Sequence, residues 1–107
     1  MSHKVINIGY DVSGVPPPSF VCDRAALAHN LEILDLVQRR TGSRILLALK
    51  GVAMFSLFDQ IREVLHGASA SSLSEALLAA EEFGREVHVY APAYSDKKFT
   101  ECLSSTP

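Results

Sequence analysis

The sequence predicts an α/β fold made of parallel βα units, and three observations support this. Strand-like apolar runs alternate with helix-like segments along the 107 residues. The expected strands start near residues 19, 45, 68 and 87, a repeat of about 20 to 26 residues. The run at residues 45–49 is apolar throughout, which is typical of a strand buried on both faces. Such alternation favours a parallel sheet with helices outside it.

Two architectures fit this organisation. One is a four-stranded open sheet that is complete by itself. The other is the first part of a (β/α)₈ barrel, which needs about 200 residues or more and cannot close within this chain. The order of the elements alone leaves both architectures open.

The N-terminal third predicts an irregular segment, a strand and a long helix. Residues 1–18 form the irregular lead-in, because three consecutive prolines at its end cannot lie inside a helix or a central strand. A short strand is expected at residues 19–22. A helix follows over residues 24–41, with Asp23 as its N-cap and Gly42 at its end. Its buried face is predicted from four apolar residues at helical spacing: Leu27, Leu31, Leu34 and Val37.

The middle of the chain predicts two strands with a helix between them. The first strand covers residues 45–49 and the second covers residues 68–70. The helix between them is expected over residues 54–65, with Gly67 as its stop. The residues expected to point inward from this helix are Phe55, Phe58, Ile61 and Leu65.

A capping box marks the start of the next helix. Ser72 is the expected N-cap, and Glu75 is expected to reach back to the backbone amide of Ser72. This helix is predicted to run to Phe83, where Gly84 ends it.

The C-terminal part predicts one more strand and one more helix. The strand is expected at residues 87–90, and a loop with a proline follows it. Asp96 is expected to cap a last helix that runs through Leu103.

Composition is that of an ordinary globular protein, with 48% hydrophobic and 21% charged residues. The net charge of −2 gives no basic field for nucleic acid or an anionic membrane. No apolar run approaches the roughly 20 residues of a membrane span, and no signal core follows the first residues, so a cytoplasmic location is expected. Cys22 and Cys102 lack metal-ligand spacing and are expected to be reduced thiols.

Several site motifs are absent from the sequence. No GxGxxG follows a strand, and there is no phosphate-binding GxxxxGK[ST] loop or GxSxG elbow. The four histidines are scattered without paired spacing, so no metal site is expected and each is interpreted as structural.

Lys50 is the first candidate functional residue. It ends the apolar run at residues 45–49 and precedes Gly51. A charged amine there is costly unless a site uses it, and α/β proteins place their chemistry at the C-terminal ends of parallel strands. A lysine in such a position loses its proton more readily and can form a Schiff base with a carbonyl. The alternative is a structural lysine that extends into solvent, and the pattern leaves both interpretations open.

Five segments together carry a resemblance to a known family. They are PSFVCD at 18–23, NLEIL at 30–34, LALKG at 47–51, ASSLSE at 70–75 and EVHVYAPAY at 86–94. They resemble the N-terminal part of the carboxynorspermidine (carboxyspermidine) decarboxylases. These enzymes belong to the fold-type III group dependent on pyridoxal 5'-phosphate (PLP), together with alanine racemase. The match covers about residues 17 to 103.

The resemblance implies that the chain forms the first part of a TIM-type (β/α)₈ PLP-binding barrel. Lys50 matches the family's catalytic lysine, which also binds the cofactor. Ala48 is expected under the cofactor ring, with Ser69 and Ser71 beside it. Relatives of the ornithine decarboxylase type carry an aspartate where Ser69 stands, so this chain lacks a charge there. Tyr94 is expected to contact the substrate.

The implied reaction is decarboxylation of carboxynorspermidine or carboxyspermidine to norspermidine or spermidine, in a homodimeric enzyme of polyamine biosynthesis. Residues 19–107 would be the N-terminal portion of the barrel domain. The phosphate-binding glycines, the acidic partner of the pyridine nitrogen and a C-terminal β-domain would lie beyond it. The chain by itself is therefore expected to be inactive. The alternatives are a non-catalytic PLP-binding barrel protein of the cofactor-homeostasis type, and a small α/β domain with a structural Lys50.

Overall fold

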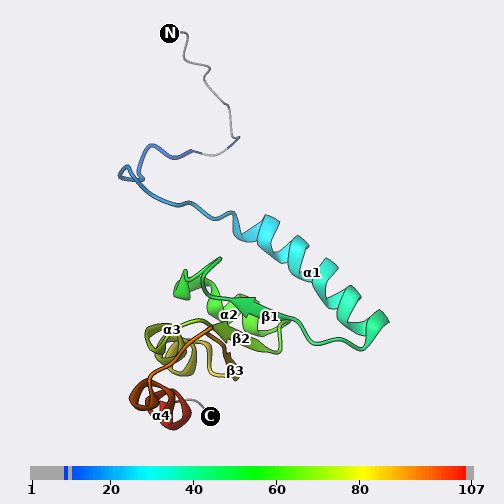
Figure 1. Ribbon diagram of the computed structural model, residues 1–107. Helices are drawn as coiled ribbons and strands as arrows, with labels where there is room; N and C mark the ends of the chain where they lie inside the picture. Colours follow the sequence, from blue (N-terminus) through cyan, green and yellow to red (C-terminus); the bar gives the residue numbers. More distant parts are fainter. Residues whose placement is uncertain (1–8, 10, 106–107) are drawn as a thin grey trace.

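Helices and strands alternate along the computed structural model, which describes residue 9 and residues 11–105 (Figure 1). The elements are α1 (Arg24–Thr41), β1 (Leu46–Ala48), η1 (Phe55–Leu57), α2 (Phe58–Arg62), β2 (Gly67–Ala70), α3 (Leu73–Leu78), η2 (Ala79–Phe83), β3 (Glu86–Val89) and α4 (Asp96–Ser105). η1 is a 3₁₀ turn that leads into α2, and η2 is a π-helical turn that continues α3. The expected α/β organisation is confirmed.

The sheet has three parallel strands in the order β1-β2-β3. In its register Ala48 pairs with Ser69, and Ser69 pairs with His88. The parallel sheet expected from the βα repeat is therefore present, while these three strands by themselves do not form a barrel.

The first expected strand is absent. Residues 19–22 form no strand, and the chain before α1 is an extended blue-to-cyan trace that does not join the sheet, although Cys22 packs against the core (Figure 1). The side chain of Phe20 is 94% exposed. A strand exists only through a neighbour that completes its hydrogen bonds, and in the part described none of the three sheet strands pairs with this segment. Apolar character alone was therefore not sufficient.

α1 has the predicted bounds and both predicted caps. The carboxylate of Asp23 accepts hydrogen bonds from the amides of Ala25 and Ala26, at 2.9 and 3.3 Å. Gly42 ends the helix in the left-handed region, with φ of 71°. These are local signals, which is why the sequence located both ends correctly.

The buried face of α1 differs from the prediction at one position. Leu31 is buried, and Leu27 and Leu34 pack against the core. Val37, however, is 42% exposed, and the buried residue next to it is Gln38. A polar side chain is preferred at position 38 because the carbonyl oxygen of Val64 and the amide of Ile45 both need a hydrogen-bond partner there.

The second helix is shorter than predicted. Instead of a helix over residues 54–65, a 3₁₀ turn leads into the five residues of α2. Phe55 was expected to point inward but is 59% exposed, because it begins the 3₁₀ turn and not the helix proper. Gly67 was expected to stop the helix but is the first residue of β2. The remaining inward residues are confirmed as buried: Phe58, Ile61 and Leu65.

The core lies on one face of the sheet. Phe58 and Phe83 are fully buried and meet edge to face, with ring centroids 5.4 Å apart. Each strand contributes to the same cluster through one of Leu47, Ala68 and Val87. The opposite face, here called the open face, contributes no residue to this cluster and consists of Leu46, Ala48, Gly67, Ser69, Glu86 and His88. The expectation that the first sheet strand is buried on both faces was therefore wrong.

The capping box before α3 is half formed. The hydroxyl of Ser72 accepts a hydrogen bond from the amide of Glu75 at 3.2 Å, as predicted. The reciprocal bond is not made, and Oε1 of Glu75 is buried without a hydrogen-bond partner. Gly84 ends η2 in the left-handed region, with φ of 74°, as predicted. At α4 the hydroxyl that accepts from an amide of the first turn belongs to Ser95, and Asp96 is the first helical residue.

Candidate functional site

Lys50 lies in a tight turn at the C-terminal end of β1. The amides of Gly51 and Val52 both donate to the carbonyl oxygen of Ala48, at 2.9 and 3.2 Å. Leu49 anchors the turn, because its side chain is buried and its amide donates to the carbonyl oxygen of Ser69 at 3.1 Å. Lys50 itself is exposed, next to this anchor. The backbone of the turn is thus held on both sides while the amine remains accessible.

Two of the other predicted cofactor residues are direct neighbours in the sheet. Ala48 of β1 pairs with Ser69 of β2, and both lie on the open face. Ser71 follows β2 directly and is half-buried. Because the C-terminal ends of parallel strands meet at one edge, the structure gathers Lys50, Ala48 and the two serines at the same end of β1 and β2. Ala48, Ser69 and Ser71 all have small side chains.

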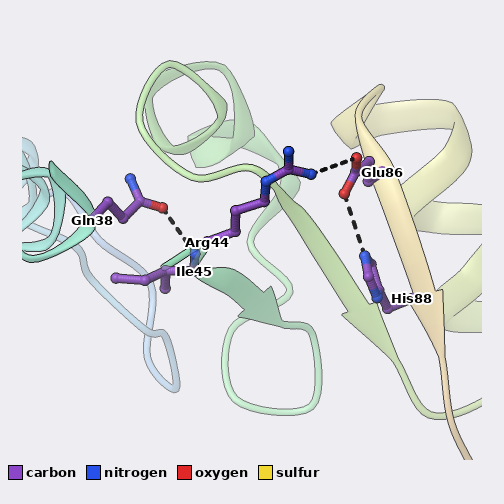
Figure 2. A network of polar contacts seen from close by, with 5 residues as sticks. All are labelled: Gln38, Arg44, Ile45, Glu86 and His88. Carbon is purple, nitrogen blue, oxygen red and sulfur yellow. Dashed lines mark hydrogen bonds and ion pairs between the residues drawn. The ribbon is translucent and has the colours of Figure 1, made fainter. Parts of the chain in front are cut away.

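A polar network that the sequence did not predict lies on the open face (Figure 2). His88 pairs with Ser69 in the register, and its Nε2 lies 3.4 Å from a carboxylate oxygen of Glu86. The other carboxylate oxygen of Glu86 lies 3.5 Å from Arg44, which precedes β1. Residue spacing gave no signal for the contact of Arg44 with Glu86, because these residues are brought together only by the sheet. Glu86 and His88 are two residues apart in β3, a spacing that places both on one face of a strand.

Tyr94 is not brought to the open face. It lines a cavity of about 180 Å³ together with Val87 and Val89, which belong to the helix-covered side of β3, and with Cys102 of α4. Its hydroxyl is buried without a hydrogen-bond partner. Burial, then the nearby Cys102 and Glu75, raise the pKa of the Tyr94 phenol. The predicted contact of Tyr94 with substrate therefore stays a prediction.

Across the described residues, no group of three or more histidine, cysteine and acidic side chains is arranged so that it could hold a metal ion. Neither Cys22 nor Cys102 forms a disulfide bond. Over the same residues, none of the helices has the length and apolar character needed to cross a membrane.

Three curated proteins with similar sequences are named decarboxylases. The chain is 53% identical over 96 residues to the carboxyaminopropylagmatine decarboxylase of Synechocystis sp., over 88% of this chain and 25% of that protein. It is 37% identical over 90 residues to the carboxynorspermidine/carboxyspermidine decarboxylase of Herminiimonas arsenicoxydans, over 84% of this chain and 25% of that protein. The protein of that name from Campylobacter jejuni is 33% identical over 90 residues. No family model matches the sequence.

One solved structure with a similar fold is also a decarboxylase of this kind. The crystal structure of carboxynorspermidine decarboxylase from Campylobacter jejuni, complexed with norspermidine, matches with a TM-score of 0.73 and 35% sequence identity. The match covers 77% of this chain and 22% of that one. The resemblance to carboxynorspermidine and carboxyspermidine decarboxylases is confirmed. The chain spans about a quarter of the length of the curated relatives it matches.

Proposed function

We propose that this chain supplies the cofactor lysine, Lys50, of a PLP-dependent decarboxylase of polyamine biosynthesis. The observation that carries the proposal is the exposed Lys50 in an anchored turn at the C-terminal end of β1, beside the paired Ala48 and Ser69. A PLP enzyme needs an amine at that kind of position, close to a surface that can receive a flat ring. The names of the similar proteins support the same chemistry.

The residues present fit PLP at the aldehyde end of the cofactor. The amine of Lys50 is accessible, Ala48 offers a small side chain on the open face, and the hydroxyls of Ser69 and Ser71 can donate hydrogen bonds. When bound, the cofactor supplies an electron sink for the charge left by a departing carboxylate. In this proposal Lys50 binds the cofactor and moves a proton, Ala48 leaves space for the ring, and the two serines orient it.

The proposed substrates are polyamines, or amines on the route to them, that carry an additional carboxylate. Carboxynorspermidine and carboxyspermidine are expected from the sequence motifs and from two of the relatives. Carboxyaminopropylagmatine enters the proposal through the relative at 53% identity. In each case the products are CO₂ and the corresponding amine. A homodimeric assembly and a cytoplasmic location are part of the proposal.

Covalent labelling of the protein tests the role of Lys50. After incubation with PLP and reduction with borohydride, intact mass and peptide mapping should show one phosphopyridoxyl group, on Lys50. Lys98→Ala is the matched control, because this exposed lysine should be dispensable. Lys50→Ala should abolish the label. Label spread evenly over Lys50, Lys97 and Lys98 would mean that Lys50 has no special site and would contradict the proposal.

Turnover separates the enzyme from a non-catalytic PLP-binding protein. CO₂ release should be measured with each of the three carboxylated amines, using the product of the complete gene. Release from at least one of them, lost in Lys50→Ala, is the expected result. Labelling of Lys50 without CO₂ release from any of the three would favour the cofactor-homeostasis alternative.

A further inference from the structure

Gln38 is the buried polar side chain in the part of the chain that the structure describes, with 7% of its surface exposed. Both atoms of its amide are used. Nε2 donates to the carbonyl oxygen of Val64 at 3.0 Å, and Oε1 accepts from the amide of Ile45 at 2.9 Å. Figure 2 shows the bond to Ile45, which reaches from α1 to the residue before β1. A buried amide with both bonds made is stable where it stands and costly to disturb.

The two partners of Gln38 lie just before two neighbouring strands. Ile45 immediately precedes β1, and Val64 lies three residues before β2. The amide of His66 also donates to the carbonyl oxygen of Ile45, at 3.1 Å. One side chain of α1 therefore holds the starts of β1 and β2 at a fixed offset from each other.

This offset decides where Lys50 lies. β1 has only three residues and pairs only with β2 among the strands described, so few ladder bonds hold its register. A slip of one residue would move Ala48 from one face of the sheet to the other. A slip of two residues would move the turn with Lys50 by about 7 Å along the sheet. Either slip would move Lys50 away from Ser69 and Ser71, which lie at the C-terminal end of β2.

We propose that Gln38 is a positioning residue for Lys50, which fixes the register of β1 against β2 through its bonds to Ile45 and Val64. The importance of that position for catalysis rests on the proposed function. The role of Gln38 in fixing the register does not rest on the proposed function, so the register and the function can be tested separately.

Amide hydrogen exchange is the decisive measurement, with Gln38→Met as the variant. Methionine fills a similar volume and makes neither bond. The amide of Leu49 reports the far end of β1, because it donates to the carbonyl oxygen of Ser69. The amide of Tyr90 is the internal reference, since it donates to the carbonyl oxygen of Ala70 at the far end of β3. Gln60→Met is the control variant, because Gln60 also donates to a backbone carbonyl of α1, that of Arg24, but at the other end of the helix.

In Gln38→Met the exchange of Leu49 should accelerate about tenfold relative to Tyr90, because the hydrogen bonds that hold the register are gone. Gln60→Met should leave this ratio unchanged. Equal acceleration of both amides, or acceleration confined to Ile45, would overturn the proposal. Equal acceleration would mean that the variant loses stability throughout. Acceleration of Ile45 alone would mean that Gln38 binds this one amide without holding the register of the strand.

A second variant keeps the test decisive if Gln38→Met does not fold. Gln38→Asn keeps an uncharged amide on a side chain one methylene shorter, which cannot reach both backbone partners, so the exchange ratio should lie between those of the wild type and the methionine variant. An unchanged ratio in Gln38→Asn would show that the register does not need both bonds and would overturn the two-bond proposal.

The labelling of Lys50 links the register to the site. In Gln38→Met, the share of phosphopyridoxyl label on Lys50 relative to Lys98 should fall several-fold. If the wild type shows no preference for Lys50, the proposed function fails, while the exchange ratio still decides the role of Gln38.

Discussion

Gly67 lies directly beside Glu86 in the parallel ladder between β2 and β3, and only the absence of a side chain permits this approach. A Cβ atom on Gly67 would overlap the carbonyl oxygen of Glu86 and come within 3.0 Å of its Cβ. The same Glu86 forms the ion pair with Arg44 and the polar contact with His88 on the open face. The glycine therefore sets how closely β3 and the network on it approach the strands with the candidate site.

Gly67→Ala should destabilise the protein by about 2 kcal/mol or more, because the backbone of a neighbouring strand has to move aside. Urea unfolding measures this as a lower midpoint. Gly14→Ala is the control, since a Cβ there meets nothing within 4 Å and no positive φ is involved. Equal stability of the two variants would mean that β2 and β3 adjust freely and that Gly67 has no packing role.

The cap of α1 gives a second stability prediction. Asp23→Ala should cost about 1 kcal/mol, because the amides of Ala25 and Ala26 lose their acceptor. Asp23→Asn keeps a side-chain oxygen and should recover most of the loss. Thermal unfolding of the three proteins measures the difference. If the asparagine variant were as unstable as the alanine variant, the loss would come from charge and not from the hydrogen bonds.

The sequence predicted best those features that depend on neighbours along the chain. Asp23 and Gly42 bound α1 as expected, since caps act within a few residues. Residues 19–22 failed as a strand because pairing depends on a partner elsewhere. Phe55 failed as a core residue because it begins a 3₁₀ turn ahead of α2 and is not part of that helix.

The residues of the candidate site also divide into those that the sequence predicted and those that it did not. Lys50 stands out in the sequence because a lysine directly follows an apolar run. The direct pairing of Ala48 with Ser69 agrees with their expected proximity, which came from a family resemblance and not from spacing. Gln38 gave no sequence signal, since its contacts depend on the packing of α1 against the residues before β1 and β2. His88 was interpreted only as structural, and the pairing that places it beside Ser69 depends on strand register. Sequence alone also did not indicate that Tyr94 lies on the helix-covered side.

The aromatic pair of the core gives a third prediction. Phe58 is fully buried against Phe83, so Phe58→Ala should cost about 3 to 5 kcal/mol and leave a cavity. Phe55→Ala is the matched control three residues earlier, where the ring is 59% exposed and a much smaller loss is expected. Urea unfolding of both variants gives the comparison. A large loss in Phe55→Ala would contradict the placement of that ring at the surface.

Tyr94 gives a prediction at alkaline pH. Burial, followed by Cys102 and Glu75, raises the pKa of Tyr94 in the folded protein above the value of about 10 expected in the unfolded chain. The folded state thus favours the neutral phenol. Its contribution to stability is fully present below about pH 10 and is lost as the pH rises through the folded pKa.

Tyr94→Phe removes this titration, so its unfolding midpoint should fall less than that of the wild type between about pH 8 and about pH 11. Near neutral pH the variant should be no less stable, because the hydroxyl it removes is buried without a partner. Tyr90→Phe is the matched control, since that side chain is 75% exposed and follows the same strand. Urea titrations at both pH values measure the difference. A parallel fall in the wild type and in Tyr94→Phe would show that the Tyr94 hydroxyl is open to water, and would return this side chain to the residues available for contact with substrate.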